Sequence, residues 1–81
     1  MNATLNAAAL QLDVIASIAR RIDVQALLLR EALDHGRQTD VARVAGEALE
    51  MLRGDAMRAQ HRAQEAALAI RNAAAVVEVQ P

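Results

Sequence analysis

The sequence predicts an all-α fold in which two long helices form an antiparallel hairpin. Ala, Leu, Arg, Glu and Gln, the residues that lose least on entering a helix, dominate the chain on both sides of one break. That break, residues 35–39, is the only place before the C-terminus where turn-forming residues gather. On both sides of it, apolar residues recur every three to four positions, the spacing of one helix face. Two such hairpins packed together form a four-helix bundle, and we expect a homodimer of that architecture.

The first helix is expected from about residue 4 to residue 34. Thr4 is a suitable N-cap, and Asn2 offers a second one. Gly36 follows the expected end, where glycine favours the left-handed conformation that closes a helix. The residues expected to face the second helix have a heptad-like spacing. They are Leu5, Ala8, Leu12, Ile15, Ala19, Ile22, Ala26, Leu29 and Leu33.

The second helix is expected from about residue 40 to residue 75, with Thr39 as its N-cap and Asp40 in its first turn. Gly54-Asp55 opens an alternative, a three-helix bundle, because Gly could end one helix and Asp cap the next. We favour a continuous helix because the apolar spacing keeps its phase across Gly54. Residues 76–81, β-branched and ending in Pro, are expected to fray. The expected inner face consists of Val41, Ala45, Ala48, Leu52, Ala56, Ala59, Ala63, Ala66, Ile70, Ala73 and Val77.

The composition predicts one small domain that self-associates. With 81 residues, the chain is near the lower size limit for a self-sufficient core. It contains no Cys for disulfides or thiolate zinc sites, and no aromatic residue to enlarge a core. An alanine-rich seam in a lone hairpin would offset too little of the conformational entropy lost on folding. Nine basic and ten acidic residues, for a net charge of −1, give no general attraction to nucleic acid or anionic membranes.

A second apolar stripe on the first helix is the predicted partner-binding surface. Leu27, Leu28 and Leu29 spread over about 200° of the helix circumference, so they cannot all face the second helix. An exposed apolar stripe marks an interaction site. We expect it to bind a second copy of the chain, a helix of another protein, or both. The predicted binding residues are Leu10, Val14, Val24, Leu27 and Leu28.

Few residues could carry chemistry, so we predict a non-enzymatic protein without a metal, a cofactor or a small-molecule substrate. Glu31 and His35, like His61 and Glu65, have the i, i+4 spacing of metal ligands, but the two pairs are expected far apart, and two ligands do not make a structural site. No targeting segment and no apolar run of about 18 residues is evident. We therefore expect a cytoplasmic adaptor, inhibitor or regulator that does not enter membranes.

The alternative is a nucleic-acid-binding hairpin. Four arginines, Arg20, Arg21, Arg58 and Arg62, are expected near the middle of the hairpin, where they could meet phosphates. Acidic residues are interspersed among them, and the chain has no aromatic side chain on which bases could stack. Nucleic acid is therefore expected as a partner only under this alternative.

Overall fold

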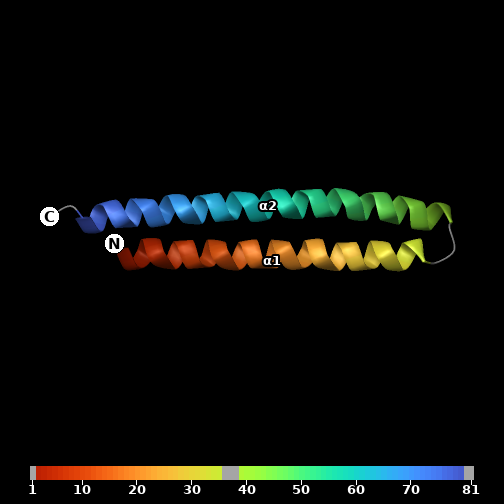
Figure 1. Ribbon diagram of the computed structural model, residues 1–81, viewed down its shortest axis with the longest axis horizontal. Helices are drawn as coiled ribbons and strands as arrows, with labels where there is room; N and C mark the ends of the chain where they lie inside the picture. The colour runs from red at the N-terminus through yellow and green to blue at the C-terminus, as the bar shows by residue number, and fades with distance from the viewer. Residues whose placement is uncertain (1, 36–38, 80–81) are drawn as a thin grey trace.

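The computed structural model describes residues 2–35 and 39–79, which form two long helices, α1 (Asn2–Asp34) and α2 (Asp40–Val79). The two helices run antiparallel and side by side (Figure 1). The Cα trace measures 66 × 13 × 13 Å, so the molecule is a rod only two helices wide. The predicted all-α hairpin is confirmed.

The helix ends differ from the expected ones in two places. α1 begins at Asn2, so Thr4 lies inside the helix and is not its N-cap. α2 continues to Val79, four residues beyond the expected end. At its start, the Thr39 side-chain oxygen accepts a hydrogen bond from the backbone N–H of Ala42 at 3.1 Å, which confirms Thr39 as the N-cap. The predicted role of Gly36 lies outside the described residues.

Helix α2 is continuous through Gly54. Asp55 does not cap a new helix; it pairs with Arg58 on the next turn. A Cβ on Gly54 would meet only the Arg58 guanidinium, at an ordinary contact distance of 3.5 Å. The three-helix alternative is therefore wrong.

The two helices meet along a seam in which every buried side chain is an alanine. Most of the buried and half-buried positions follow alternating steps of three and four residues, the pattern of a coiled coil, and we call this set the seam. On α1 the seam consists of Asn2, Leu5, Ala9, Leu12, Ala16, Ala19, Asp23, Ala26, Arg30 and Leu33. On α2 it consists of Ala42, Gly46, Leu49, Arg53, Ala56, Gln60, Ala63, Ala67, Ile70 and Ala74.

This seam corrects the inner face predicted for α1. Ile15, Ile22 and Leu29 were expected inside, yet they are 49%, 39% and 55% exposed. Alanines take the inner positions because two helices approach most closely where both carry small side chains. The helix is therefore rotated so that its larger apolar residues lie beside the seam.

The inner face predicted for α2 is also only partly right. Ala56 and Ala63 are buried, and Ala45, Ala66 and Ile70 are half-buried. The other expected positions whose side chains are described lie at the surface: Val41, Ala48, Leu52, Ala59 and Ala73. The Val77 side chain lies outside the described part of the structure.

Candidate interaction surface

The two-helix layer has two broad faces, one on each side of the seam. At 3.6 residues per turn, Asp13 and Ile15 lie about 80° to either side of the seam direction on α1. Asp13 reaches across to Arg71 on α2, whereas Ile15 is exposed. We call the side of Asp13 the charged face and the side of Ile15 the apolar face.

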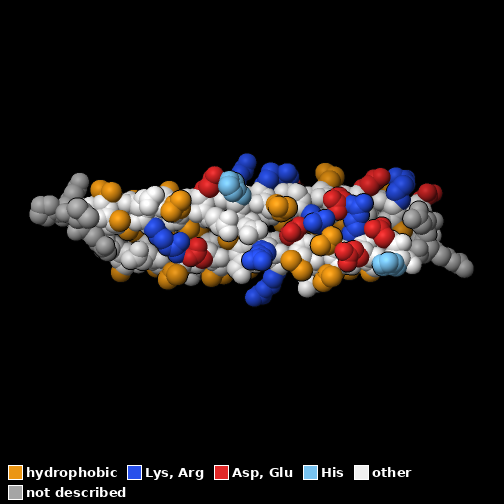
Figure 2. Space-filling view, in the orientation of Figure 1, with side chains coloured by type: hydrophobic (Ala, Val, Ile, Leu, Met, Phe, Trp, Pro, Cys, Tyr) orange, Lys and Arg blue, Asp and Glu red, His pale blue; other side chains and the backbone are white. Residues whose placement is uncertain are grey.

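The charged face carries the ion pairs that join the two helices in the described residues. Asp23 accepts a hydrogen bond from Nε of Arg53 at 3.0 Å, and Arg53 also donates to Glu50 at 3.1 Å. Glu50 in turn pairs with Arg30 on α1 at 2.7 Å. Acidic and basic side chains accordingly lie side by side along the line where the helices meet (Figure 2). This network holds the two helices in one register.

A second link on the charged face joins Asp13 to Arg71 near the other end of the hairpin. Arg71 donates hydrogen bonds from both terminal nitrogens to the two carboxylate oxygens of Asp13. These hydrogen bonds lower the pKa of Asp13; desolvation opposes the effect, and the positive charge of Arg71 adds to it.

The apolar face is the surface that the sequence argument missed. Its centre is a shallow groove between the helices, walled by Ile18, Ile22 and Leu29 of α1 and by Leu49 and Leu52 of α2. A second shallow apolar depression, lined by Val41, Val44, Ala45 and Ala48 with Asp40, lies nearer the turn. The apolar face is therefore continuous over both helices.

A second three-and-four repeat in the sequence could have revealed this face. On α1 the repeat consists of Thr4, Ala8, Gln11, Ile15, Ile18, Ile22, Gln25, Leu29 and Ala32, all uncharged. On α2 it consists of Val41, Ala45, Ala48, Leu52, Asp55, Ala59, Arg62, Ala66, Ala69, Ala73 and Val76, with only two charged members. Both repeats are in phase with the seam, so each forms one straight stripe on its helix.

The predicted partner-binding stripe lies mainly on the outer side of α1. Leu10, Val14, Val24 and Leu28 are 60%, 51%, 46% and 52% exposed. Helix geometry turns them about 130° to 180° away from α2. Leu27 is half-buried on the side of the charged face and does not belong to this group. We call the four exposed residues the outer stripe.

The four arginines of the nucleic-acid alternative are all exposed, but they do not share a face. Arg20 lines a polar groove on the charged face with Asp13, Gln60 and Gln64. Arg21 instead lines the groove of the apolar face. Arg58 is paired with Asp55. Arg20 and Arg21, adjacent in the sequence, therefore line grooves on opposite faces of the hairpin.

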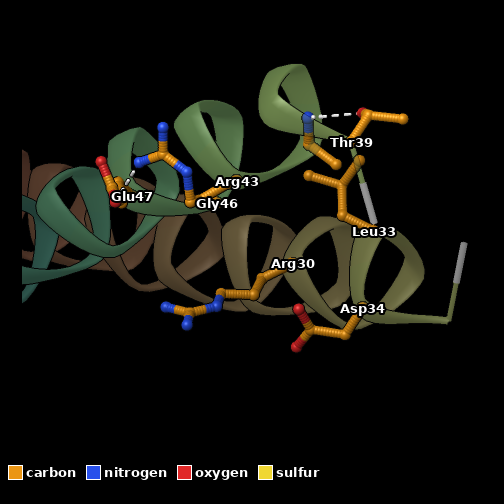
Figure 3. Close-up of a pocket in the computed structure, with 8 residues that line it drawn as sticks. Arg30, Leu33, Asp34, Thr39, Arg43, Gly46 and Glu47 are labelled. Atoms are coloured by element: carbon orange, nitrogen blue, oxygen red, sulfur yellow. Dashed lines mark hydrogen bonds and ion pairs between the residues drawn. The ribbon is translucent and has the colours of Figure 1, made fainter. Parts of the chain in front are cut away.

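A pocket at the turn end of the hairpin has balanced charge. Arg30, Asp34, Arg43 and Glu47 line it, together with Leu33, Thr39, Ala42 and Gly46 (Figure 3). Arg43 pairs with Glu47 at 3.1 Å, and the Thr39 hydroxyl is engaged in capping α2. Arg30 pairs with Glu50 across the seam. The two positive and two negative side chains that line the pocket balance each other.

The histidine pairs have surface positions. His61 Nε2 lies 2.8 Å from Glu65 Oε1, with both side chains about two-thirds exposed or more. Within residues 2–35 and 39–79, no group of three or more His, Cys, Asp or Glu side chains is placed to hold a metal ion.

Neither helix, over the residues that the structure describes, contains an apolar stretch long enough to cross a membrane. A scan against protein-family models and searches of curated proteins and of solved structures found no match to this chain.

Proposed function

We propose that this chain is a small non-enzymatic protein–protein interaction module, an adaptor, inhibitor or regulator, and that it acts as a homodimeric four-helix bundle in the cytoplasm. One observation carries the proposal: among the described residues the seam buries only alanines, whereas most of the large apolar side chains of α1 are exposed outside it. The exposed ones are Leu10, Val14, Ile15, Ile18, Ile22, Val24, Leu28 and Leu29.

Burial energetics support association. Covering a Val, Leu or Ile side chain completely stabilises a protein by about 1.5–3 kcal/mol. Alanine contributes far less, so the seam alone is a weak core for a chain of this length. A helix that is apolar around most of its circumference is typical of a position inside a larger core. A second hairpin would supply that core.

The outer stripe supports a further partner. A second layer of helices covers one face of the hairpin and leaves the opposite edge of α1 free. Leu10, Val14, Val24 and Leu28 have the spacing that receives an amphipathic helix of another protein. In this proposal, the dimer is the scaffold and the outer stripe is the docking site for that protein.

Sedimentation equilibrium of the purified chain, diluted across the micromolar range, tests self-association. We expect a mass of twice 8.7 kDa, with helical circular dichroism retained at the same concentrations. A single-chain mass at every concentration, in a fully helical sample, would contradict the homodimer. Fractionation of the host cells tests the cytoplasmic location.

A further inference from the structure

We infer that the apolar face binds a second copy of the chain in one defined orientation. Helix α1 lies antiparallel on α1 of the second copy, α2 lies on α2 of the second copy, and the two turns are at opposite ends. The inference rests on the proposed self-association and names the surface and the register through which it occurs.

Helix geometry selects the apolar face rather than the outer stripe. In a four-helix bundle each helix contacts two neighbours in directions roughly at right angles. On α1, the stripe Ile15, Ile18 and Ile22 is turned about 100° from the seam, as such a bundle requires. The outer stripe is turned about 150° away on average, so pairing through it would place four helices in a flat row.

The stripe on α1 matches itself when reversed. A twofold interface requires every contact to occur twice, so the surface must be complementary to its own rotated copy. About a centre at Ile18, Ile15 falls opposite Ile22 of the second copy, and Gln11 falls opposite Gln25. Farther out, Ala8 falls opposite Leu29, a small residue against a large one. Apolar residues meet apolar ones and amides meet amides.

The stripe on α2 is also self-complementary, about a centre at Ala59. Leu52 falls opposite Ala66 of the second copy, and Val41 near the turn falls opposite Val76. The two charged members of the stripe, Asp55 and Arg62, fall opposite each other, so the dimer contains two complementary ion pairs.

The two centres lie at the same level along the hairpin. Ala16 and Ser17 of α1 line one groove with Gln60 of α2, so Ile18 and Ala59 lie on neighbouring turns across the seam. One twofold axis can therefore pass through both centres. Folding of a single hairpin does not require this coincidence, whereas a symmetric dimer does.

Area and charge agree with this assignment. A face 66 Å long and 13 Å wide matches the ~800 Å² that each partner buries in an interface of standard size. The stripe on α1 carries no charge.

Cysteine cross-linking tests the orientation, because the natural chain contains no Cys. Ile18→Cys and Ala59→Cys each place one thiol at the proposed axis, whereas the matched control Ser17→Cys places it in the polar groove of the charged face, outside the interface. Under mild oxidation we expect disulfide-linked dimers from the first two variants and none from the control. Linking of Ser17→Cys alone, in a chain that sediments as a dimer, would overturn the interface and leave self-association intact. A natural chain that sediments as a monomer would overturn both.

Charge reversal tests the register of the dimer, and it uses several variants so that the result does not depend on whether any one of them folds. Asp55→Arg and Arg62→Asp each place like charges opposite one another, and we expect each to raise the dimer dissociation constant by about tenfold or more. An equimolar mixture of the two variants restores both complementary pairs, so its heterodimer should bind within about threefold of the natural chain. A mixture no tighter than the separate variants would overturn the register. The double variant Asp55→Arg/Arg62→Asp, which reverses both charges in one chain, should behave as the mixture does.

Discussion

Asp23 and Arg53 occupy seam positions that a coiled coil usually gives to apolar residues. Their side chains are only 22% and 26% exposed, and each is hydrogen-bonded to the other. Replacing such a pair by apolar residues is often neutral for stability, whereas removing one partner leaves a charge poorly compensated. We interpret the pair as a device that fixes the register of the hairpin.

Variants of Asp23 and Arg53 test this interpretation. Asp23→Ala should lower the free energy of unfolding by about 1–3 kcal/mol, because Arg53 loses one of its two acidic partners. Asp23→Ala combined with Arg53→Leu should recover most of that loss. Urea unfolding at fixed protein concentration measures both. If the double variant loses as much free energy of unfolding as Asp23→Ala and Arg53→Leu lose separately when added together, the interpretation is contradicted.

Asp13 gives the hairpin a predictable response to acid. Arg71 lowers the pKa of Asp13 below its usual 3.8, chiefly through the hydrogen bonds between them. A lowered pKa means that the contact stabilises the folded chain above pH 3.8 and is lost as the pH falls through the lower folded-state value. Asp13→Asn should therefore lower Tm slightly at neutral pH, and the difference from the natural chain should vanish in acid. A difference in Tm that does not shrink as the pH falls below 3.8 would contradict this assignment.

At the scale of the helix, the two elements follow from local rules. Residues with high helix propensity occupy both, and capping chemistry appears where α2 begins. Neither Gly54 nor the β-branched residues after Ala75 ends α2 early. Packing along the seam and the favourable propensity of the flanking residues outweigh these local weaknesses.

Removal of the α2 cap tests the first turn of that helix. Thr39→Ala should lower the free energy of unfolding by about 1 kcal/mol, because the N–H of Ala42 loses its side-chain acceptor. Thr39→Ser should be nearly neutral, since serine caps as well. Thr4→Ala is the matched control: Thr4 lies inside α1, so its replacement should have no destabilising effect. Equal losses for Thr39→Ala and Thr4→Ala in chemical unfolding would contradict the assigned cap.

Gly54 tests the continuity of α2. Gly54→Ala should stabilise the protein by about 0.5–1 kcal/mol, because alanine is the better helix former and its Cβ meets only the flexible Arg58 side chain. Gly54→Pro should cost about 3 kcal/mol or more, as proline does within a helix. Thermal unfolding followed by circular dichroism compares them. A destabilising Gly54→Ala would indicate a bend that alanine cannot adopt.

At the scale of the whole molecule, a rod two helices wide has no interior beyond its seam. The stability that a small domain lacks in its own core must come from another source, and here no disulfide can supply it. We infer that this stability comes from association of two apolar faces, because burying the exposed isoleucines is favourable.

Folding should consequently depend on protein concentration. If the dimer is the stable form, Tm should rise as the concentration increases from about 1 to 100 μM, by mass action. Ile18→Arg on the apolar face should abolish this dependence, whereas Leu28→Arg on the outer stripe should preserve it. Differential scanning calorimetry over the dilution series measures both, and a Tm independent of concentration in the natural chain would contradict a folded dimer.

The exposure of the outer stripe could be predicted from the sequence of α1 alone. Leu10, Val14, Val24 and Leu28 were predicted to be exposed because one partner helix cannot cover every side of α1, and they are. Ile15, Ile22 and Leu29 were placed inside because they fit the same apolar spacing, and they lie on the apolar face instead. Since α1 is apolar in several directions, hydrophobicity alone did not specify which direction faces α2.

The sequence by itself determined the two helices, the position of the break and the cap at Thr39, because these depend on residues close together in the chain. Only the tertiary structure decided how each helix is rotated. That rotation depends on close packing of small side chains across the seam and on ion pairs between residues 30 and 58 positions apart, such as Asp23 with Arg53 and Asp13 with Arg71. Periodicity within one helix reveals the apolar stripes but not which of them packs against the other helix, so the seam and the apolar face are told apart only once the two helices are packed together.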